Sequence, residues 1–188
     1  MDHDLTGLRI AFLVHNSGVE QPELEQPWQD LQGAGATTTL IAPETGTVQA
    51  FTNDVEKADT FTAEVALADA DPDAFDALVL PGGTTNADAL RLEADAVAFV
   101  TSFTEAGKPV AAICHAPWLL VEADLVRGKK LTSYASLQTD VRNAGGSWVD
   151  EEAVVCAERG FTLVTSRDPD DLDAFVAAAA EVFAGSRD

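Results

Sequence analysis

Short apolar runs alternate with longer amphipathic segments along nearly the whole chain, and this alternation limits the possible folds more than any other feature. The aliphatic runs are nearly continuous, which is typical of strands that are buried on both faces of a parallel sheet. We therefore predict an α/β sandwich, with helices covering both sides of the sheet. The predicted strands are 9–15, 37–43, 76–80, 109–114 and a pair near 147–155 and 161–166. The predicted helices are 23–35, 92–107, 116–125, 136–145 and 168–185. A small hairpin is predicted from 47–51 and part of 60–67.

The chain is long enough for one well-buried core, because 46% of its 188 residues are hydrophobic. We therefore expect a single domain over residues 1–188. No stretch approaches the roughly 20 consecutive apolar residues that span a bilayer. Residues 1–15 have acidic residues before the apolar run and lack the basic region and cleavage pattern of a targeting peptide. A soluble cytoplasmic protein is the expectation.

The charge is strongly negative, with 32 acidic and 11 basic residues and a formal net charge of −21. Such a surface repels nucleic-acid phosphates and anionic lipid headgroups, which argues against nucleic-acid and membrane partners. The acidic residues are dispersed over predicted loops and helix faces, a distribution that favours a role in solubility, and a specific cationic partner is the alternative.

Polar or glycine-rich segments follow three of the predicted strands, at 15–23, 81–88 and 114–117. In open parallel sheets, ligands bind beyond the carboxyl ends of the strands, where the loops diverge. The topology therefore predicts that these three segments meet at one site.

Cys114 lies between a predicted strand and a predicted helix, where a nucleophile elbow would place its nucleophile. Such an elbow needs small residues two positions away on each side, and here these are Ala112 and Ala116. Backbone N–H groups at the start of the following helix would favour the thiolate and stabilise a developing oxyanion. The neighbouring His115 is a general acid or base for neutral pH. The alternative is that Cys114 is a small buried core residue.

Cys156, the only other cysteine, lies in a β-rich run without a glycine turn or histidine beside it and is interpreted as a core residue. The two cysteines are too few for a disulfide framework, and no Cys/His cluster has the spacing of a metal site. The segment 81–88 also lacks the glycine spacing of a dinucleotide loop. No metal or organic cofactor is therefore predicted.

Four segments together, 19–51, 81–92, 111–120 ("AAICHAPWLL") and 136–155, resemble the ThiJ/PfpI superfamily, whose wider group is the class I glutamine amidotransferase-like proteins. Within it, the chain is similar to the branch of the intracellular protease PfpI and related stress-induced proteins. The similarity extends from about residue 8 to about residue 184. It implies a flavodoxin-like three-layer α/β/α sandwich with a mainly parallel sheet and a nucleophile elbow.

The resemblance also implies roles for individual residues. Cys114 corresponds to the nucleophile and His115 to the histidine that follows it. Glu23 corresponds to the glutamate that approaches the sulfur, with Glu20 as the nearby alternative. From the local pattern alone, Glu23 would be interpreted as an acid that a helix start favours.

Gly82 and Gly83 correspond to the glycine turn whose N–H lies near the nucleophile, although any sharp turn after a strand would also favour glycine. Asp88 corresponds to an acidic residue that reaches the histidine of a neighbouring subunit, and it is equally consistent with a helix start. If the first role holds, the protein is a homo-oligomer, a dimer or a hexamer, with a site built across an interface.

Two features depart from the family pattern. Ala116 replaces a glycine that many members have after the Cys-His pair, and it keeps the small-residue requirement. The histidines are His3, His15 and His115, so the distant histidine that serves the cysteine of glutamine amidotransferases is missing. Glutamine hydrolysis is therefore not expected. His15 would either lie near the site or cap its strand.

Three functions follow from these residues. The first is a glyoxalase-type or deglycase-type enzyme, in which the Cys114 thiolate adds to an aldehyde or glycation adduct while Glu23 or His115 transfers protons. The second is a cysteine peptidase oriented by His115 and Asp88. The third is not an enzyme: it is either a peroxide sensor, in which Cys114 is oxidised and Glu23 and the helix start stabilise the product, or a chaperone with an exposed apolar surface.

Overall fold

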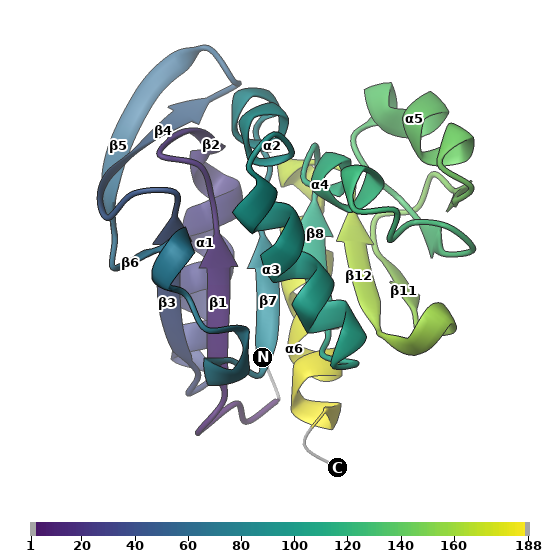
Figure 1. Ribbon diagram of the computed structural model, residues 1–188. Coiled ribbons are helices and arrows are strands. Elements are labelled where there is room, and N and C mark those ends of the chain that lie inside the picture. The colour runs from purple at the N-terminus through teal and green to yellow at the C-terminus, as the bar shows by residue number, and fades with distance from the viewer. Residues whose placement is uncertain (1–2, 187–188) are drawn as a thin grey trace.

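A seven-stranded sheet forms the middle of the protein, in the order β11-β12-β8-β7-β1-β3-β6 (Figure 1). The computed structural model describes residues 3–186. Every neighbouring pair is parallel except β11 and β12, which are antiparallel. The predicted mainly parallel sheet is therefore confirmed. The strands are β1 (Arg9–Leu13), β3 (Thr37–Ala42), β6 (Val65–Ala66), β7 (Ala77–Leu80), β8 (Val110–Ile113), β11 (Val154–Cys156) and β12 (Leu163–Ser166).

Helices cover both faces of this sheet, as Figure 1 shows. Successive residues of β1 explain the continuous apolar runs, since Ile10 and Phe12 belong to one core cluster and Ala11 and Leu13 to the other. Side chains of a strand alternate between faces, and both faces are buried here. The helices on one face are α1 (Gln21–Gly33) and α6 (Leu172–Gly185), and those on the other are α2 (Thr84–Leu90), α3 (Ala94–Glu105), α4 (Pro117–Glu122) and α5 (Gln138–Asn143).

Two elements lie in segments that the sequence predicted as loops. The strand β2 (Ser17–Glu20) follows β1 after a short turn, and the helix α2 begins directly after Gly83. Neither has an apolar run that would predict it. Both are stabilised by close packing on each other, because a side chain at Gly18 would collide with Thr85 and the backbone of Asn86.

Smaller sheets flank the central one. β2 pairs with β4 (Gly46–Thr52), which forms the predicted hairpin with β5 (Glu56–Ala63). At the other end, β9 (Lys130–Leu131) pairs with β10 (Ser147–Trp148). The sequence placed 147–155 in one strand that pairs with 161–166. Only β11 does so, because the N–H groups of Ser147 and Val149 bind the carbonyls of Lys129 and Leu131 instead.

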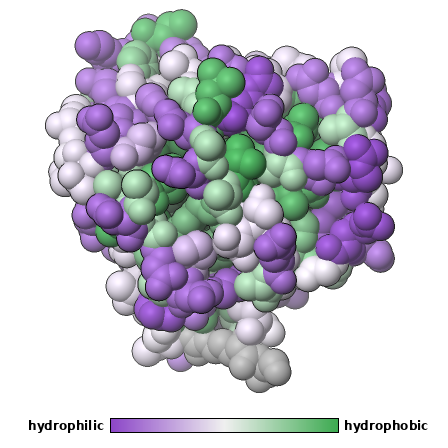
Figure 2. All heavy atoms as spheres, in the orientation of Figure 1, coloured by the Kyte–Doolittle hydropathy of each residue, from purple (hydrophilic) through white to green (hydrophobic). Residues whose placement is uncertain are grey.

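Hydrophilic residues cover most of the face that includes α2, α3 and α4, with hydrophobic residues in small areas between them (Figure 2). This distribution agrees with a formal net charge of −21. Between residues 3 and 186, none of the helices has both the length and the apolar character needed to cross a membrane.

Lys129 is fully buried before β9, where its ammonium group donates to backbone carbonyls of three residues, Cys156 (3.5 Å), Phe161 (2.5 Å) and Glu158. The ammonium nitrogen also lies 3.5 Å from the centroid of the Phe161 ring. Burial lowers the pKa of Lys129, and the neighbouring Cys156 and Glu158 oppose this shift. A single side chain thus satisfies the carbonyls of the turn between β11 and β12.

We expect Lys129→Met to lower the free energy of unfolding by about 2–3 kcal/mol, because the three carbonyls lose their donor while the volume is kept. Lys130→Met is the matched control, since Lys130 makes a half-exposed ion pair with Glu151 and should change stability by about 0.5 kcal/mol or less. Urea denaturation of both variants measures the difference. Equal stabilities of the two variants would contradict the role of Lys129.

Candidate active site

Cys114 forms the sharp turn between β8 and α4 with a left-handed backbone conformation, at a φ of 62°. This conformation costs a residue with a side chain about 1–2 kcal/mol. The backbone holds it in place, because the Cys114 N–H donates to the Ser166 carbonyl (3.1 Å) and the Cys114 carbonyl accepts from the Tyr134 N–H (2.8 Å). Ala112 and Ala116 are buried on either side. The geometry is that of the predicted elbow.

Glu23 lies in the first turn of α1 and is completely buried. Burial raises the pKa of its carboxyl to about 8, while the nearby Cys114 thiol and Gly82 N–H offset part of the shift. Neither carboxyl oxygen has a hydrogen-bond partner of full geometry among residues 3–186. At neutral pH the carboxyl is therefore protonated and has a hydrogen to donate beside the sulfur.

Gly82 and Gly83 lie where the backbone approaches this pair most closely. A side chain at Gly82 would collide with the Glu23 carboxyl and would lie 2.7 Å from Cys114 Cβ. Gly83 has a φ of 94° and abuts the Gly18 carbonyl. Its N–H faces Cys114 and lowers the pKa of that thiol. Both positions therefore require glycine, and the expected N–H group is present near the sulfur.

His115 lies with Nδ1 3.1 Å from Cys114 Sγ. The Ser136 hydroxyl is 3.4 Å from Nε2. The Thr84 hydroxyl is 3.3 Å from Nε2 and 3.5 Å from Nδ1, and it donates to Asp54 at 2.7 Å. Since this hydroxyl uses its only hydrogen on Asp54, it can only accept from the imidazole. In the tautomer with hydrogen on Nε2, a bare Nδ1 faces the sulfur. The Tyr134 ring stacks on the imidazole with centroids 4.6 Å apart.

Burial keeps the Cys114 thiol protonated at rest. Burial is the largest effect on its pKa and raises it. The N–H groups of Gly83 and His115 lower it by less. Burial also lowers the pKa of His115, against the attraction of Asp54, so the imidazole is neutral at pH 7. The thiol therefore faces a neutral base, and a thiolate forms when the proton moves to it.

The resemblance allowed Glu20 as an alternative to Glu23 for the acid beside the sulfur, but the Glu20 carboxylate binds the backbone of another turn. Its carboxylate accepts from the N–H groups of Asn53 (2.9 Å) and Asp54 (3.0 Å), both of which have a positive φ. Glu20 thus holds the turn between β4 and β5, and Glu23 is the acid beside the sulfur.

Asp88 is exposed on α2, where it makes an ion pair with Arg91 at 3.0 Å. It does not line the cavity above Cys114 within one chain. Its predicted role toward the histidine of a second copy stays a prediction. Within the chain, Asp54 reaches His115 through Thr84 instead.

Several residues of the site were missed by the sequence analysis: Asp54, Thr84, Asn86 and Tyr134. The buried Asn86 amide donates to the carbonyls of Pro81 and Gly82 (3.0 Å each) and accepts from the His15 N–H (2.7 Å). His15 thus lies at the end of β1, beside the glycine turn. The Asn-Asp pair before β5 was the one available signal for Asp54, since these residues tolerate left-handed turns.

A cavity of about 200 Å³ opens above the sulfur, and the three predicted loops meet there. The prediction of their convergence is thus confirmed. In the described part of the chain, no group of three His, Cys, Asp or Glu side chains is placed to hold a metal ion. The cavity is lined by Glu20, Glu23, Asn53, Asp54, Gly83, Cys114, His115, Tyr134 and Pro169.

Comparisons with known proteins agree with this architecture. Residues 8–182 match the profile of the DJ-1/PfpI family. Protein/nucleic acid deglycase 2 of Escherichia coli is 39% identical over 89% of this chain and 92% of its own length. General stress protein 18 of Bacillus subtilis is 40% identical over 83% of this chain and 87% of its own. Deglycase PfpI of Pyrococcus furiosus is 37% identical over 90% of this chain and 95% of its own.

Solved structures show the same fold. A two-domain protein of Anabaena variabilis with DJ-1/ThiJ/PfpI-like and ferritin-like domains superimposes with a TM-score of 0.83 at 33% identity, over 93% of this chain and 47% of its own. Oxidised DJ-1 of Toxoplasma gondii superimposes with a TM-score of 0.81 at 22% identity, over 96% of this chain and 91% of its own. The predicted flavodoxin-like sandwich is therefore confirmed.

We expect Glu23→Gln to stabilise the protein increasingly as the pH rises from 4.5 to about 8. The folded state holds the Glu23 proton up to about pH 8, while the unfolded chain releases it near 4.5. The stability that this proton contributes is thus complete below pH 4.5 and lost as the pH approaches 8. One pKa unit corresponds to about 1.4 kcal/mol, so the difference from wild type should change by more than about 2 kcal/mol.

Denaturant unfolding of wild type and Glu23→Gln at several pH values measures this change. Glu25→Gln, on the same helix but only half-buried, is the control and should follow the wild type. A stability difference that is independent of pH would contradict the protonated state of Glu23.

Proposed function

Because the chain belongs to the DJ-1/PfpI family, as its resemblance to the ThiJ/PfpI superfamily predicted, we propose that it is a stress-response enzyme that repairs aldehyde or glycation adducts through Cys114. The observation that supports this most is the position of the Cys114 sulfur, between a protonated acid and a neutral base. Relatives named deglycases and a general stress protein, at 37–40% identity, support the same class of function.

The two titratable neighbours of the sulfur have their pKa values shifted in opposite senses. Burial raises the pKa of Glu23 and lowers that of His115. Groups shifted in this way are suited to act as an acid and a base in the same pH range. His115 Nδ1 therefore accepts the thiol proton, and Glu23 donates a proton to the substrate oxygen. The N–H of Gly83 is placed to bind that oxygen while charge develops on it.

An α-oxoaldehyde such as methylglyoxal shows how these groups act together. The sulfur forms a bond to the aldehyde carbon, the C=O π bond becomes an O–H bond, and a hemithioacetal results. The carbon-bound proton then moves to the neighbouring carbonyl carbon, and the hydroxyl proton moves to the oxygen of that carbonyl. A thioester results, so one carbon is oxidised and the other reduced. Water then cleaves the thioester, which releases lactate and restores the thiol. The sequence needs no external oxidant or reductant.

A cysteine peptidase is the second candidate, and the short contact between Cys114 Sγ and His115 Nδ1 (3.1 Å) favours it. The relay from His115 through Thr84 to Asp54 resembles the way in which a third group orients the base in hydrolytic triads. A peptidase would form an acyl-enzyme at Cys114 from a peptide bond. In an oligomer, Asp88 of a second copy would then contact His115.

We expect the purified protein to form lactate from methylglyoxal, and Cys114→Ser to abolish this turnover. Cys156→Ser, the matched control, should keep it, since Cys156 is buried in β11 and does not line the cavity. Lactate is measured enzymatically under identical conditions for all three proteins. Absence of turnover in the wild type would exclude this chemistry, and peptide cleavage or selective peroxide oxidation of Cys114 would be tested next.

We expect Asp54→Asn to lower kcat about tenfold or more, because His115 loses the charge that orients it through Thr84. The activity of the wild type should fall above about pH 8, where Glu23 loses its proton.

The pH profile of kcat should also differ between the two proteins. At the acid end, the pH at which Asp54→Asn loses activity should be lower than for the wild type, since the attraction of Asp54 raises the pKa of His115. Asp88→Asn is the parallel variant, and aldehyde turnover should survive it better than Glu23→Gln. If the acid end of the pH profile is the same in Asp54→Asn and in the wild type, the contact from Asp54 through Thr84 to His115 has no role in the reaction.

A further inference from the structure

A second cavity, of about 280 Å³, adjoins the one above Cys114. The two cavities share Tyr134 as a wall, and Asp168 of the second precedes Pro169 of the first. We propose that this second cavity is a subsite for a cationic side chain, lysine or arginine, of a peptide or protein whose reactive group lies at Cys114; this rests on the proposed function. It is lined by Ser133, Tyr134, Ala135, Gln138, Trp148, Asp150, Arg167 and Asp168.

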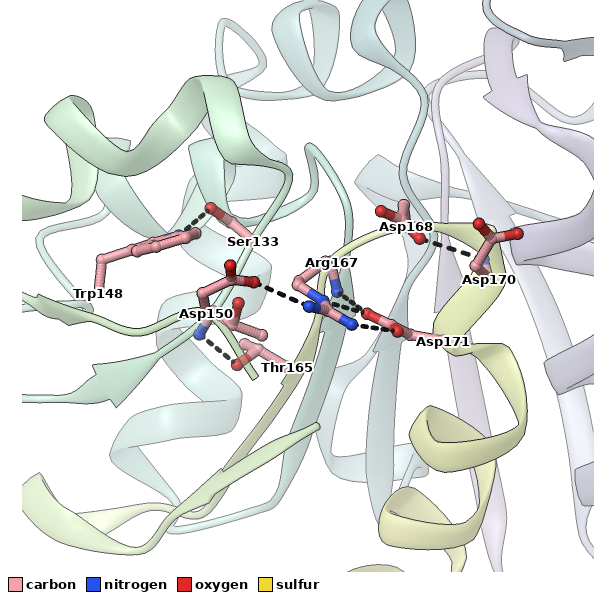
Figure 3. Close-up of polar contacts among 9 residues, drawn as sticks. Ser133, Trp148, Asp150, Thr165, Arg167, Asp168, Asp170 and Asp171 are labelled. Carbon is pink, nitrogen blue, oxygen red and sulfur yellow. Dashed lines mark hydrogen bonds and ion pairs between the residues drawn. The ribbon is translucent and has the colours of Figure 1, made fainter. Parts of the chain in front are cut away.

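Arg167 would make the cavity a site for anions if its guanidinium group were free, but carboxylates occupy it. Asp171 accepts from its Nε and from one terminal nitrogen, each at 2.8 Å, and Asp150 accepts from the other terminal nitrogen at 2.8 Å. Figure 3 shows the guanidinium group between these two carboxylates. Asp171 is almost completely buried, and its two hydrogen bonds to the guanidinium group form a bidentate, charge-assisted pair. The arginine charge is thus neutralised within the cluster.

The remaining charge of the cavity wall is negative. Two carboxylates, Asp150 and Asp168, line the cavity together with one arginine that Asp171 already neutralises. The side chain of Asp150 is 70% exposed. Asp168 accepts the N–H of Asp170 at 3.1 Å through one oxygen, as Figure 3 also shows. A cationic group in the cavity would therefore meet an excess of carboxylate, whereas an anionic group would be repelled.

Two aromatic residues, Trp148 and Tyr134, also line the cavity. The Trp148 indole donates to Ser133 Oγ (2.9 Å), and Ser133 donates to the Tyr134 carbonyl (3.0 Å), so one chain of hydrogen bonds fixes both residues. Arg142, which does not line the cavity, already packs on Trp148 with its guanidinium carbon 5.6 Å from the ring centroid. Aromatic faces combined with carboxylates are a recurrent environment for ammonium and guanidinium groups.

The position of the cavity indicates what kind of molecule reaches it. A free three-carbon aldehyde is small enough to fit within the cavity of about 200 Å³ above the sulfur. Only a substrate that continues past Tyr134 places a second group beside Trp148 and Asp168. The subsite would therefore distinguish an adduct on a basic peptide from the free aldehyde, and it would have no effect on turnover of the latter.

The experiment compares two acetylated, amidated tetrapeptides, Gly-Cys-Lys-Gly and Gly-Cys-Gln-Gly, each carrying methylglyoxal as a hemithioacetal on its cysteine. We expect the wild type to prefer the lysine peptide by about tenfold in kcat/KM, the equivalent of about 1.4 kcal/mol. In Asp150→Asn combined with Asp168→Asn, the preference should fall below about twofold, because these amides keep the hydrogen bonds to Arg167 and Asp170 but remove the charges. Turnover of free methylglyoxal should not change.

The control is Asp95→Asn combined with Glu181→Gln, which removes two exposed charges elsewhere and should keep the tenfold preference. Binding of the same peptides to Cys114→Ser, measured by calorimetry, separates the subsite from the chemistry. A binding preference for lysine without turnover by the wild type would support the subsite and contradict the proposed function. Equal binding of both peptides, or a lysine preference that survives the loss of both charges, would overturn the subsite.

Discussion

The contact between the buried Glu23 carboxyl and the Cys114 sulfur is the interaction on which the site depends. Two negative charges are not compatible with such burial, so at least one of the two groups keeps its proton. The backbone must approach both groups without a side chain, which makes Gly82 obligatory, and the sulfur reaches the carboxyl only because Cys114 adopts a left-handed conformation. The acid, the elbow and the glycine turn therefore form one unit, and changing any of them alters the pKa of the Glu23 carboxyl or of the Cys114 thiol.

The small sheet of β2, β4 and β5 supplies Asp54, the acidic residue that acts on His115 through Thr84. Its hairpin turn places Asp54 against Thr84, and Glu20 stabilises that turn by accepting two backbone N–H groups. His115 is consequently oriented from outside the parallel sheet, by residues that precede it by about 30 and 60 positions in the chain. The two acidic residues of the site thus come from different elements, Glu23 from α1 and Asp54 from the turn between β4 and β5.

The sequence was sufficient for the fold and for half of the site. Continuous apolar runs predicted the parallel sheet, and the small residues around Cys114 predicted its turn, because both depend on local patterns. Thr84 and Asp54 could not be predicted in this way, since their contacts require a hairpin turn whose conformation is held by Glu20. The pKa of Cys114 could not be predicted from the sequence either. Helix-start N–H groups are visible in a sequence, whereas the depth of burial that outweighs them is a property of the assembled fold.

Both edges of the central sheet are short, with three residues in β11 and two in β6. A long exposed edge would offer a row of unpaired backbone groups to a strand of another molecule, and these edges offer very few. Self-association by extending the central sheet is therefore disfavoured. The longer edge of the protein belongs to the small sheet, where β5 has eight residues that are mostly exposed.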